Sequence, residues 1–135
     1  MPQDRPIPGS ARDWLLRAKG DWALAAAPLP EGGFHEDLCY HAHQAAEKAL
    51  KAVYRRHAWT FRYVHDLEEL ITGLVRKGVS VPEKIKESVV LNSYAFEARY
   101  PGVGEPVTES EYRQALELAK VVVSWAEMVI EGKTE

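Results

Sequence analysis

The sequence has 135 residues and a single cysteine, Cys39, so no disulfide can form within the chain. It contains no run approaching the ~18 apolar residues that a membrane-spanning helix needs, and its first ten residues lack an apolar core of signal-peptide length. It also has no basic excess, because 17 Lys and Arg stand against 20 Asp and Glu, giving a net charge of −3. These absences favour a cytoplasmic protein without a membrane segment and argue against one that coats nucleic acid through bulk charge.

Familiar catalytic motifs are missing as well. There is no Gly-x-Ser-x-Gly nucleophile motif, and the Gly-Val-Gly at 102–104 lacks the Lys-Ser/Thr and the preceding strand of a phosphate-binding loop. No histidine follows His65.

Helical periodicity is what the chain does have, and no segment shows the period-two alternation of a strand. We expect helices over about 10–27, 34–57, 65–77, 82–99 and 108–131, with Ser10 capping the first, His65 the third, and a Thr108–Glu111 capping box opening the last. The sequence predicts an all-α fold, an up-and-down antiparallel helical bundle of four long helices plus a short one. One domain would cover residues 10–135, after a flexible arm at 1–9.

Two apolar features need a place in this bundle. The loop at 58–64 holds Trp59, Phe61 and Tyr63, which we expect to cover an end of the core. The last helix has more apolar surface than one contact face requires. Either it lies at the centre of the bundle, or its side bearing Val121, Trp125 and Met128 meets another chain.

The end of the fourth helix offers a candidate phosphate site. Arg99 lies directly before Tyr100 and Pro101, where a planar guanidinium beside a rigid turn can grip a phosphate and a tyrosine ring can stack on a base. Asn92 lies one heptad earlier, on the same side of the helix. The alternative is that Arg99 only closes its helix and pairs with Glu97 or Glu105.

A second candidate surface runs along the helix at 34–57. Lys48, Lys51 and Arg55 form a basic line, and His41 lies at its margin beside Tyr40 and Gln44. This line can receive phosphates. The alternative is an ordinary solvated face, with Glu47 and Lys51 as a surface ion pair.

A metal site is not expected. His35, Cys39 and His43 recur every four residues, but by the helix rise the outer pair is ~12 Å apart, too far for one ion. Cys39 is instead expected to be a buried thiol.

Taken in order, three segments resemble the HEPN domain (higher eukaryotes and prokaryotes nucleotide-binding). They are the run from Cys39 to Ala52, CYHAHQAAEKALKA; then His65-Asp66-Leu67 with Leu70; then Ala98-Arg99-Tyr100-Pro101. The resemblance spans about residues 10–131. It implies a helical bundle that commonly forms dimers, a cleft for nucleotides or RNA, and in many relatives a separate minimal nucleotidyltransferase as partner.

The family's ribonucleases carry an arginine followed after four to six residues by histidine. Arg99 matches the arginine, but the histidine window falls on Gly104, Glu105 and Pro106. Whether the chain is an enzyme is therefore left open.

The leading hypothesis is a nucleotide- or RNA-binding HEPN module, a homodimer, acting with a minimal nucleotidyltransferase in a toxin–antitoxin-like pair. It would need no cofactor, and ATP or another nucleotide would be a ligand. The alternatives are a metal-independent ribonuclease toxin that uses a base other than the motif histidine, and a dimeric scaffold without catalysis.

Overall fold

The computed structural model describes residues 5–95 and 106–132, and every regular element in these ranges is helical. The elements are α1 (Ala11–Ala26), α2 (His35–Arg56), α3 (Leu67–Arg76), α4 (Glu83–Lys86), the 3₁₀ helix η2 (Glu87–Tyr94) and α5 (Glu109–Glu131). The all-α prediction is confirmed. None of the helices in the described ranges is both long enough and apolar enough to cross a membrane.

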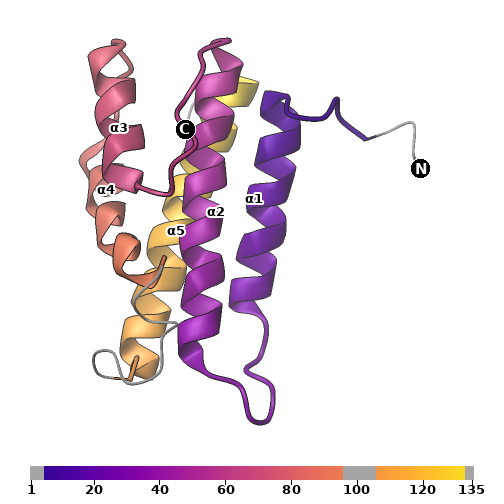
Figure 1. Cartoon of the computed structure of the whole chain (residues 1–135), viewed down its shortest axis with the longest axis vertical. Helices are drawn as coiled ribbons and strands as arrows, with labels where there is room; N and C mark the ends of the chain where they lie inside the picture. The colour runs from indigo at the N-terminus through magenta and orange to yellow at the C-terminus, as the bar shows by residue number, and fades with distance from the viewer. Residues whose placement is uncertain (1–4, 96–105, 133–135) are drawn as a thin grey trace.

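The helices form a bundle around α2 (Figure 1). In this view α1 descends on one side of α2, α3, α4 and η2 lie on the other side, and α5 ascends behind. The helices run in alternating directions: α1 down, α2 up, α4 with η2 down, and α5 up. This is the predicted up-and-down order, with α3 as the short extra helix.

The expected long fourth helix differs from the prediction. It is a single α turn of four residues that continues as eight residues of 3₁₀ helix. Its residues include Ser88, whose buried hydroxyl donates to the Ile85 carbonyl at 2.6 Å. Serine and asparagine compete for main-chain hydrogen bonds, and β-branched residues resist helix formation, so this stretch is a poor α-helix former. The predicted part beyond Ala95 lies outside the described residues.

The predicted helix caps can be compared one by one. The Ser10 side chain accepts from the Asp13 main-chain N–H, and the full capping box of Thr108 and Glu111 opens α5. Both predictions are confirmed. The prediction that His65 caps the third helix was wrong. The N-cap of α3 is Asp66, whose carboxylate accepts from the N–H groups of Glu68 and Glu69. Carboxylate oxygens accept from free helical N–H groups more readily than a histidine ring does.

The core is built on the alanines of α2, which let α1 and α5 approach closely. Both faces of this helix are covered, and the buried set includes the polar residues Glu47, Lys51 and Tyr54. The alternative of a solvated face with Glu47 and Lys51 as a surface pair is therefore wrong about their exposure. In the following loop, Trp59 and Phe61 pack against the core as predicted, but Tyr63 does not, since it is 92% exposed.

The apolar surface of α5 is largely used within the chain. Trp125 is buried in the core, and Val122 and Ala126 are fully buried. Val121 and Met128 are half-buried and line a groove of about 320 Å³ between α5 and α4. The reading of α5 as a central helix therefore accounts for Trp125 without a second chain.

Candidate functional site

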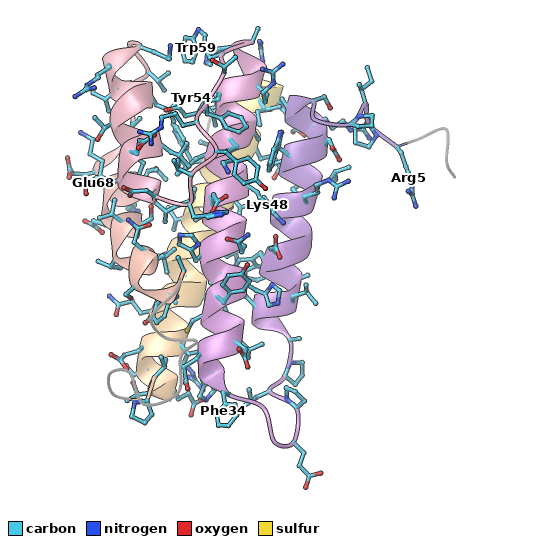
Figure 2. The ribbon with its side chains drawn as sticks, viewed as in Figure 1. Arg5, Phe34, Lys48, Tyr54, Trp59 and Glu68 are labelled. Carbon is cyan, nitrogen blue, oxygen red and sulfur yellow. The ribbon has the colours of Figure 1, made fainter. Side chains whose placement is uncertain are left out.

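One ion cluster joins α1 to α2. The buried Asp21 carboxylate of α1 accepts from the Lys48 ammonium at 2.6 Å and lies 3.0 Å from Nδ1 of His41. Lys48 is labelled in Figure 2. Two predicted ligand residues are thus brought together, but around a carboxylate that already compensates the charge of Lys48.

A second cluster lies one turn further along α2. The Glu47 carboxylate accepts from the Lys51 ammonium at 2.7 Å and lies 3.0 Å from Nδ1 of His65. Glu47 and Lys51 are each only 3% exposed. The predicted pairing of these two residues is therefore correct, and its predicted surface position is wrong. Three aromatic rings surround the ammonium at 5.3–5.7 Å from their centroids, those of Phe61, Trp14 and Tyr63.

His65 is fixed through its main chain as well as its ring. Nε2 of the fully buried His43 lies 3.0 Å from the carbonyl oxygen of His65. Burial lowers the pKa of His43, which favours its neutral form, and a carbonyl can only accept, so Nε2 carries the proton and donates. The His65 ring is 41% exposed while its Nδ1 faces the Glu47 carboxylate. When Nδ1 donates to the carboxylate, Nε2 becomes the basic nitrogen, which is the arrangement that proton transfer requires.

Asn92 serves to join η2 to the start of α3. Its side-chain oxygen accepts from the Leu67 N–H at 3.0 Å, and its amide nitrogen donates to the Asp66 carboxylate at 3.0 Å. Both ends of the amide are therefore engaged within the chain. This is a structural use of a residue that we predicted to contact the ligand.

Beside this junction lies an open hollow of about 340 Å³. It is lined by two carboxylates, an amide, an imidazole and a methyl group, contributed by Asp66, Glu68, Asn92, His65 and Ala95. Such a lining accepts hydrogen bonds from amino and imino groups better than it tolerates a bare phosphate. Ala95 is the last described residue before 96–105, the range that contains Arg99 and Tyr100, so both of these predicted site residues lie outside the described residues.

The last residue of the predicted basic line is Arg55. Its guanidinium donates to the main-chain oxygen of Trp59 at 3.1 Å, which ties the end of α2 to the following loop. A carbonyl carries no full charge, so the positive charge of Arg55 is not cancelled by this contact. Of the three residues in the line, Lys48 and Lys51 are neutralised by carboxylates and Arg55 is held by a carbonyl.

The metal alternative is not supported in the described ranges. No group of three His, Cys, Asp or Glu residues there is arranged to hold an ion. Cys39 is fully buried, and burial raises the pKa of its thiol to about 12, so the thiolate that a metal or an electrophile needs is disfavoured.

The sequence analysis missed Asp21, and it did not predict that Glu47 and His65 would lie together. Asp21 carried a signal, because it lies on the same stripe as Ala18 and Ala25, three and four residues away, and a carboxylate among buried alanines requires a cation from a facing helix. Nothing local in the sequence indicates that His65 would lie beside Glu47, 18 residues earlier.

Comparison with known proteins decides the family. The model of the HEPN domain matches residues 11–129, most of the chain. This chain belongs to the HEPN family.

Two solved structures share the HEPN fold of this chain. One is TT1696 from Thermus thermophilus, with a TM-score of 0.78 and 31% sequence identity over 90% of this chain and 98% of that one. The other is ST0689, described as an archaeal HEPN homologue, with a TM-score of 0.70 and 25% identity over the same shares. No curated protein sequence matches the chain.

Proposed function

We propose that this HEPN protein is a homodimeric nucleotide- or RNA-binding module that works with a separate minimal nucleotidyltransferase in a toxin–antitoxin-like pair. The observation that carries the proposal is the hollow at the start of α3, which His65, Asp66 and Asn92 line and which extends to Ala95. Polar groups of α3, of the two residues before it and of η2 converge there, and family membership supports a nucleotide- or RNA-related role.

The charge of the hollow indicates how a nucleotide would be oriented. Asp66 and Glu68 accept hydrogen bonds from the amino edge of a base, whereas a phosphate beside them would be repelled. The phosphate therefore needs a cation from elsewhere, and Arg99, four residues after Ala95, is our candidate. Tyr100 is the candidate for stacking or hydrogen bonding beside it.

An NMR titration tests the binding proposal. ATP, and separately a short single-stranded RNA, are added to ¹⁵N-labelled protein, and we expect shifts at His65, Asp66 and Ala95. Arg99→Ala should weaken binding at least tenfold. Arg17→Ala is the matched control, because Arg17 is an exposed arginine on α1 whose guanidinium pairs with Asp13 of the same helix. Unchanged spectra at millimolar ligand would contradict the proposal.

The proposed assembly has its own test. The chain is co-expressed with a nucleotidyltransferase encoded beside it, and the masses of the separate and mixed proteins are measured by light scattering. We expect a dimer alone and a larger complex in the mixture. A monomer in both samples would contradict the proposed homodimer and its complex with a nucleotidyltransferase.

A ribonuclease remains the second candidate, and the contact between Glu47 and His65 is what favours it. With Nδ1 donating to the buried carboxylate, Nε2 can take the proton of an RNA 2′-hydroxyl. The 2′-oxygen then bonds to phosphorus, the bond to the 5′-oxygen breaks, and the leaving oxygen takes a proton from water. The products are a 2′,3′-cyclic phosphate and a 5′-hydroxyl end.

Cleavage assays separate this candidate from simple binding. Pure protein is incubated with structured RNA, and the ends are identified by mass spectrometry. His65→Ala and Arg99→Ala should abolish cleavage, whereas His57→Ala, a change in an exposed histidine at the start of the same loop, should not. Equal cleavage by all preparations would indicate a contaminating nuclease and would contradict the ribonuclease hypothesis.

A further inference from the structure

Tyr63 is the most exposed aromatic residue among those the structure describes, at 92%. Its neighbours in the loop behave differently, because Trp59, Phe61 and Val64 pack against the core. Leaving a whole ring in water forgoes the stabilisation that its burial would give, and it leaves the ring free to contact a molecule outside the chain.

The turn that carries Tyr63 is anchored on both sides. The Val64 N–H donates to the Arg62 carbonyl at 2.9 Å, which places Tyr63 at the centre of a three-residue turn. Phe61 on one side and Val64 on the other are held by the core, and the next carbonyl, that of His65, accepts from His43. The ring is therefore presented from a fixed backbone, so that less conformational entropy is lost when a ligand binds.

The surroundings of the ring suit a flat, electron-rich ligand. The Lys51 ammonium lies over the ring, 5.7 Å from its centroid, and the His65 ring meets it edge-on at 6.1 Å and 75°. The same ammonium contacts the Glu47 carboxylate and the rings of Trp14 and Phe61. It withdraws electron density from the tyrosine ring and so strengthens stacking of an electron-rich purine on the opposite face.

Arginines supply positive charge in the same part of the chain. Residues 48–65 contain five Lys and Arg and no Asp or Glu. Lys48 and Lys51 are neutralised by Asp21 and Glu47, which leaves Arg55, Arg56 and Arg62. Arg62 is 77% exposed on its side chain and pairs with Glu69 at 3.2 Å, a surface contact weak enough for a phosphate to replace. Arg55 is one helical turn beyond Lys51 on the same side of α2, about 6 Å along the axis.

We infer that Tyr63 is a stacking platform for an unpaired nucleobase of single-stranded RNA, with Arg55 and Arg62 contacting the phosphates on either side of that base. Aromatic platforms flanked by cations are how proteins hold single strands without reading their sequence. A duplex keeps its bases stacked inside and is not a ligand for this platform. The inference rests on the proposed function, since it assigns part of the RNA-binding surface to a loop distinct from the Arg99 segment.

The test uses a short single-stranded RNA, about ten nucleotides long, with one 2-aminopurine, whose fluorescence is quenched when the base stacks. We expect the wild-type protein to bind and to quench. Tyr63→Leu keeps an apolar side chain without a π system and should weaken binding about tenfold and abolish the quenching. Tyr63→Phe and Tyr63→Trp should retain both. A duplex of the same sequence should bind at least tenfold more weakly than the single strand.

Phe34→Leu is the matched control. Phe34 is also an exposed aromatic, at 63%, and it lies at the opposite end of α2 from Trp59 (Figure 2). Its replacement should leave RNA binding unchanged. Far-UV circular dichroism of all variants confirms that the fold is retained.

The outcomes separate this inference from the proposed function. If the wild-type protein binds neither RNA nor ATP, both fail. If it binds RNA and Tyr63→Leu binds equally well, only the platform fails. If Tyr63→Leu changes the mass of the homodimer and leaves RNA affinity and quenching intact, Tyr63 belongs to a protein interface and the inference is overturned. A further outcome is that ATP competes with the RNA only in variants that retain an aromatic residue at position 63. That result would show that free nucleotides stack on the same ring, and it would support the Tyr63 platform.

Discussion

The ammonium of Lys51 lies 2.7 Å from the carboxylate of Glu47, and both side chains are buried where the loop between α2 and α3 covers α2. Two charges removed from water in this way stabilise the fold only as a pair, because either one alone would be left without compensation. The pair explains how α2 can bury two charged residues of opposite sign one turn apart.

Replacing one member of this pair should therefore be costly. We expect Lys51→Met to lower the free energy of unfolding by about 3 kcal/mol, measured by urea denaturation at pH 7. The double variant Glu47→Leu/Lys51→Met should recover part of the loss, since it leaves no buried carboxylate. Arg17→Met, which breaks an exposed pair with Asp13, should change stability by less than about 0.5 kcal/mol. Equal effects of Lys51→Met and Arg17→Met would contradict the buried pair.

Gly73 is required by a close approach between α3 and α2. A methyl group at this position would collide with the hydroxyl oxygen of Tyr54, which donates to the Leu70 carbonyl at 2.7 Å. Although alanine favours helix, Gly73→Ala should lower stability by about 1–3 kcal/mol because the tyrosine must move. In the double variant with Tyr54→Phe the hydroxyl is gone and the nearest ring atom is Cζ at 3.3 Å, so the added cost of the alanine should fall. Additive costs in a double-mutant cycle would show that the two side chains do not meet.

Asn92 gives a way to separate folding from ligand binding. Asn92→Asp replaces the amide donor by a second carboxylate beside Asp66, so we expect a loss of about 1–3 kcal/mol at pH 7. Ser93→Asp, a change at the neighbouring exposed position, should have little effect on stability. RNA affinity is compared at a temperature where both variants remain folded. We expect a selective loss in Asn92→Asp, because Asn92 lines the proposed binding hollow and a third carboxylate there would repel the RNA backbone. Equal affinities of the two variants would show that the hollow does not hold the RNA.

Local signals in the sequence were sufficient for most of the helices. Ser10, the prolines after Ala27 and the Thr108 capping box act within a few residues, so α1, α2 and α5 were predicted to within about two residues of their ends. The η2 segment was predicted as α-helix, because periodicity alone does not distinguish a 3₁₀ helix whose polar side chains bond to nearby carbonyls.

The site was less predictable, since its properties depend on contacts between distant residues. The basic line was read from the spacing of Lys48, Lys51 and Arg55 on one helix. Its charge depends on Asp21, which lies 27 residues before Lys48 in the sequence. A face that is basic on a helical wheel therefore becomes largely neutral in the bundle. The exposure of Tyr63 could likewise not be inferred from the composition of the loop at 58–64.

The pH dependence of stability should include a contribution from His43. Burial lowers its pKa below the ordinary value of 6.5, so the unfolded chain binds a proton there while the folded chain stays neutral. Stability is then full above pH 6.5 and is lost as the pH falls toward the folded pKa, by at most about 1.4 kcal/mol per unit. Three polar side chains face the ring, those of Glu47, Gln44 and Asn92.

Two measurements check the contribution of His43. Urea denaturation between pH 8 and pH 5 should show a steeper loss in the wild-type protein than in His43→Gln, which keeps a donor for the His65 carbonyl. An NMR titration of the His43 ring should place its midpoint below 6.5. A midpoint at or above that value would contradict the assignment, whether or not the variant folds.

Cys39 should be unreactive in the folded protein. Its side chain is fully buried, and burial, reinforced by Glu36 and Glu111, raises the pKa of the thiol to about 12. At pH 8 a disulfide reagent such as dithionitrobenzoate should therefore react with one thiol per chain in urea and with almost none in buffer. Reaction in buffer should proceed only through opening of the bundle, so Gly73→Ala should accelerate it in proportion to its loss of stability. A native rate equal to that of the unfolded chain, or one indifferent to Gly73→Ala, would show that the thiol is accessible without opening.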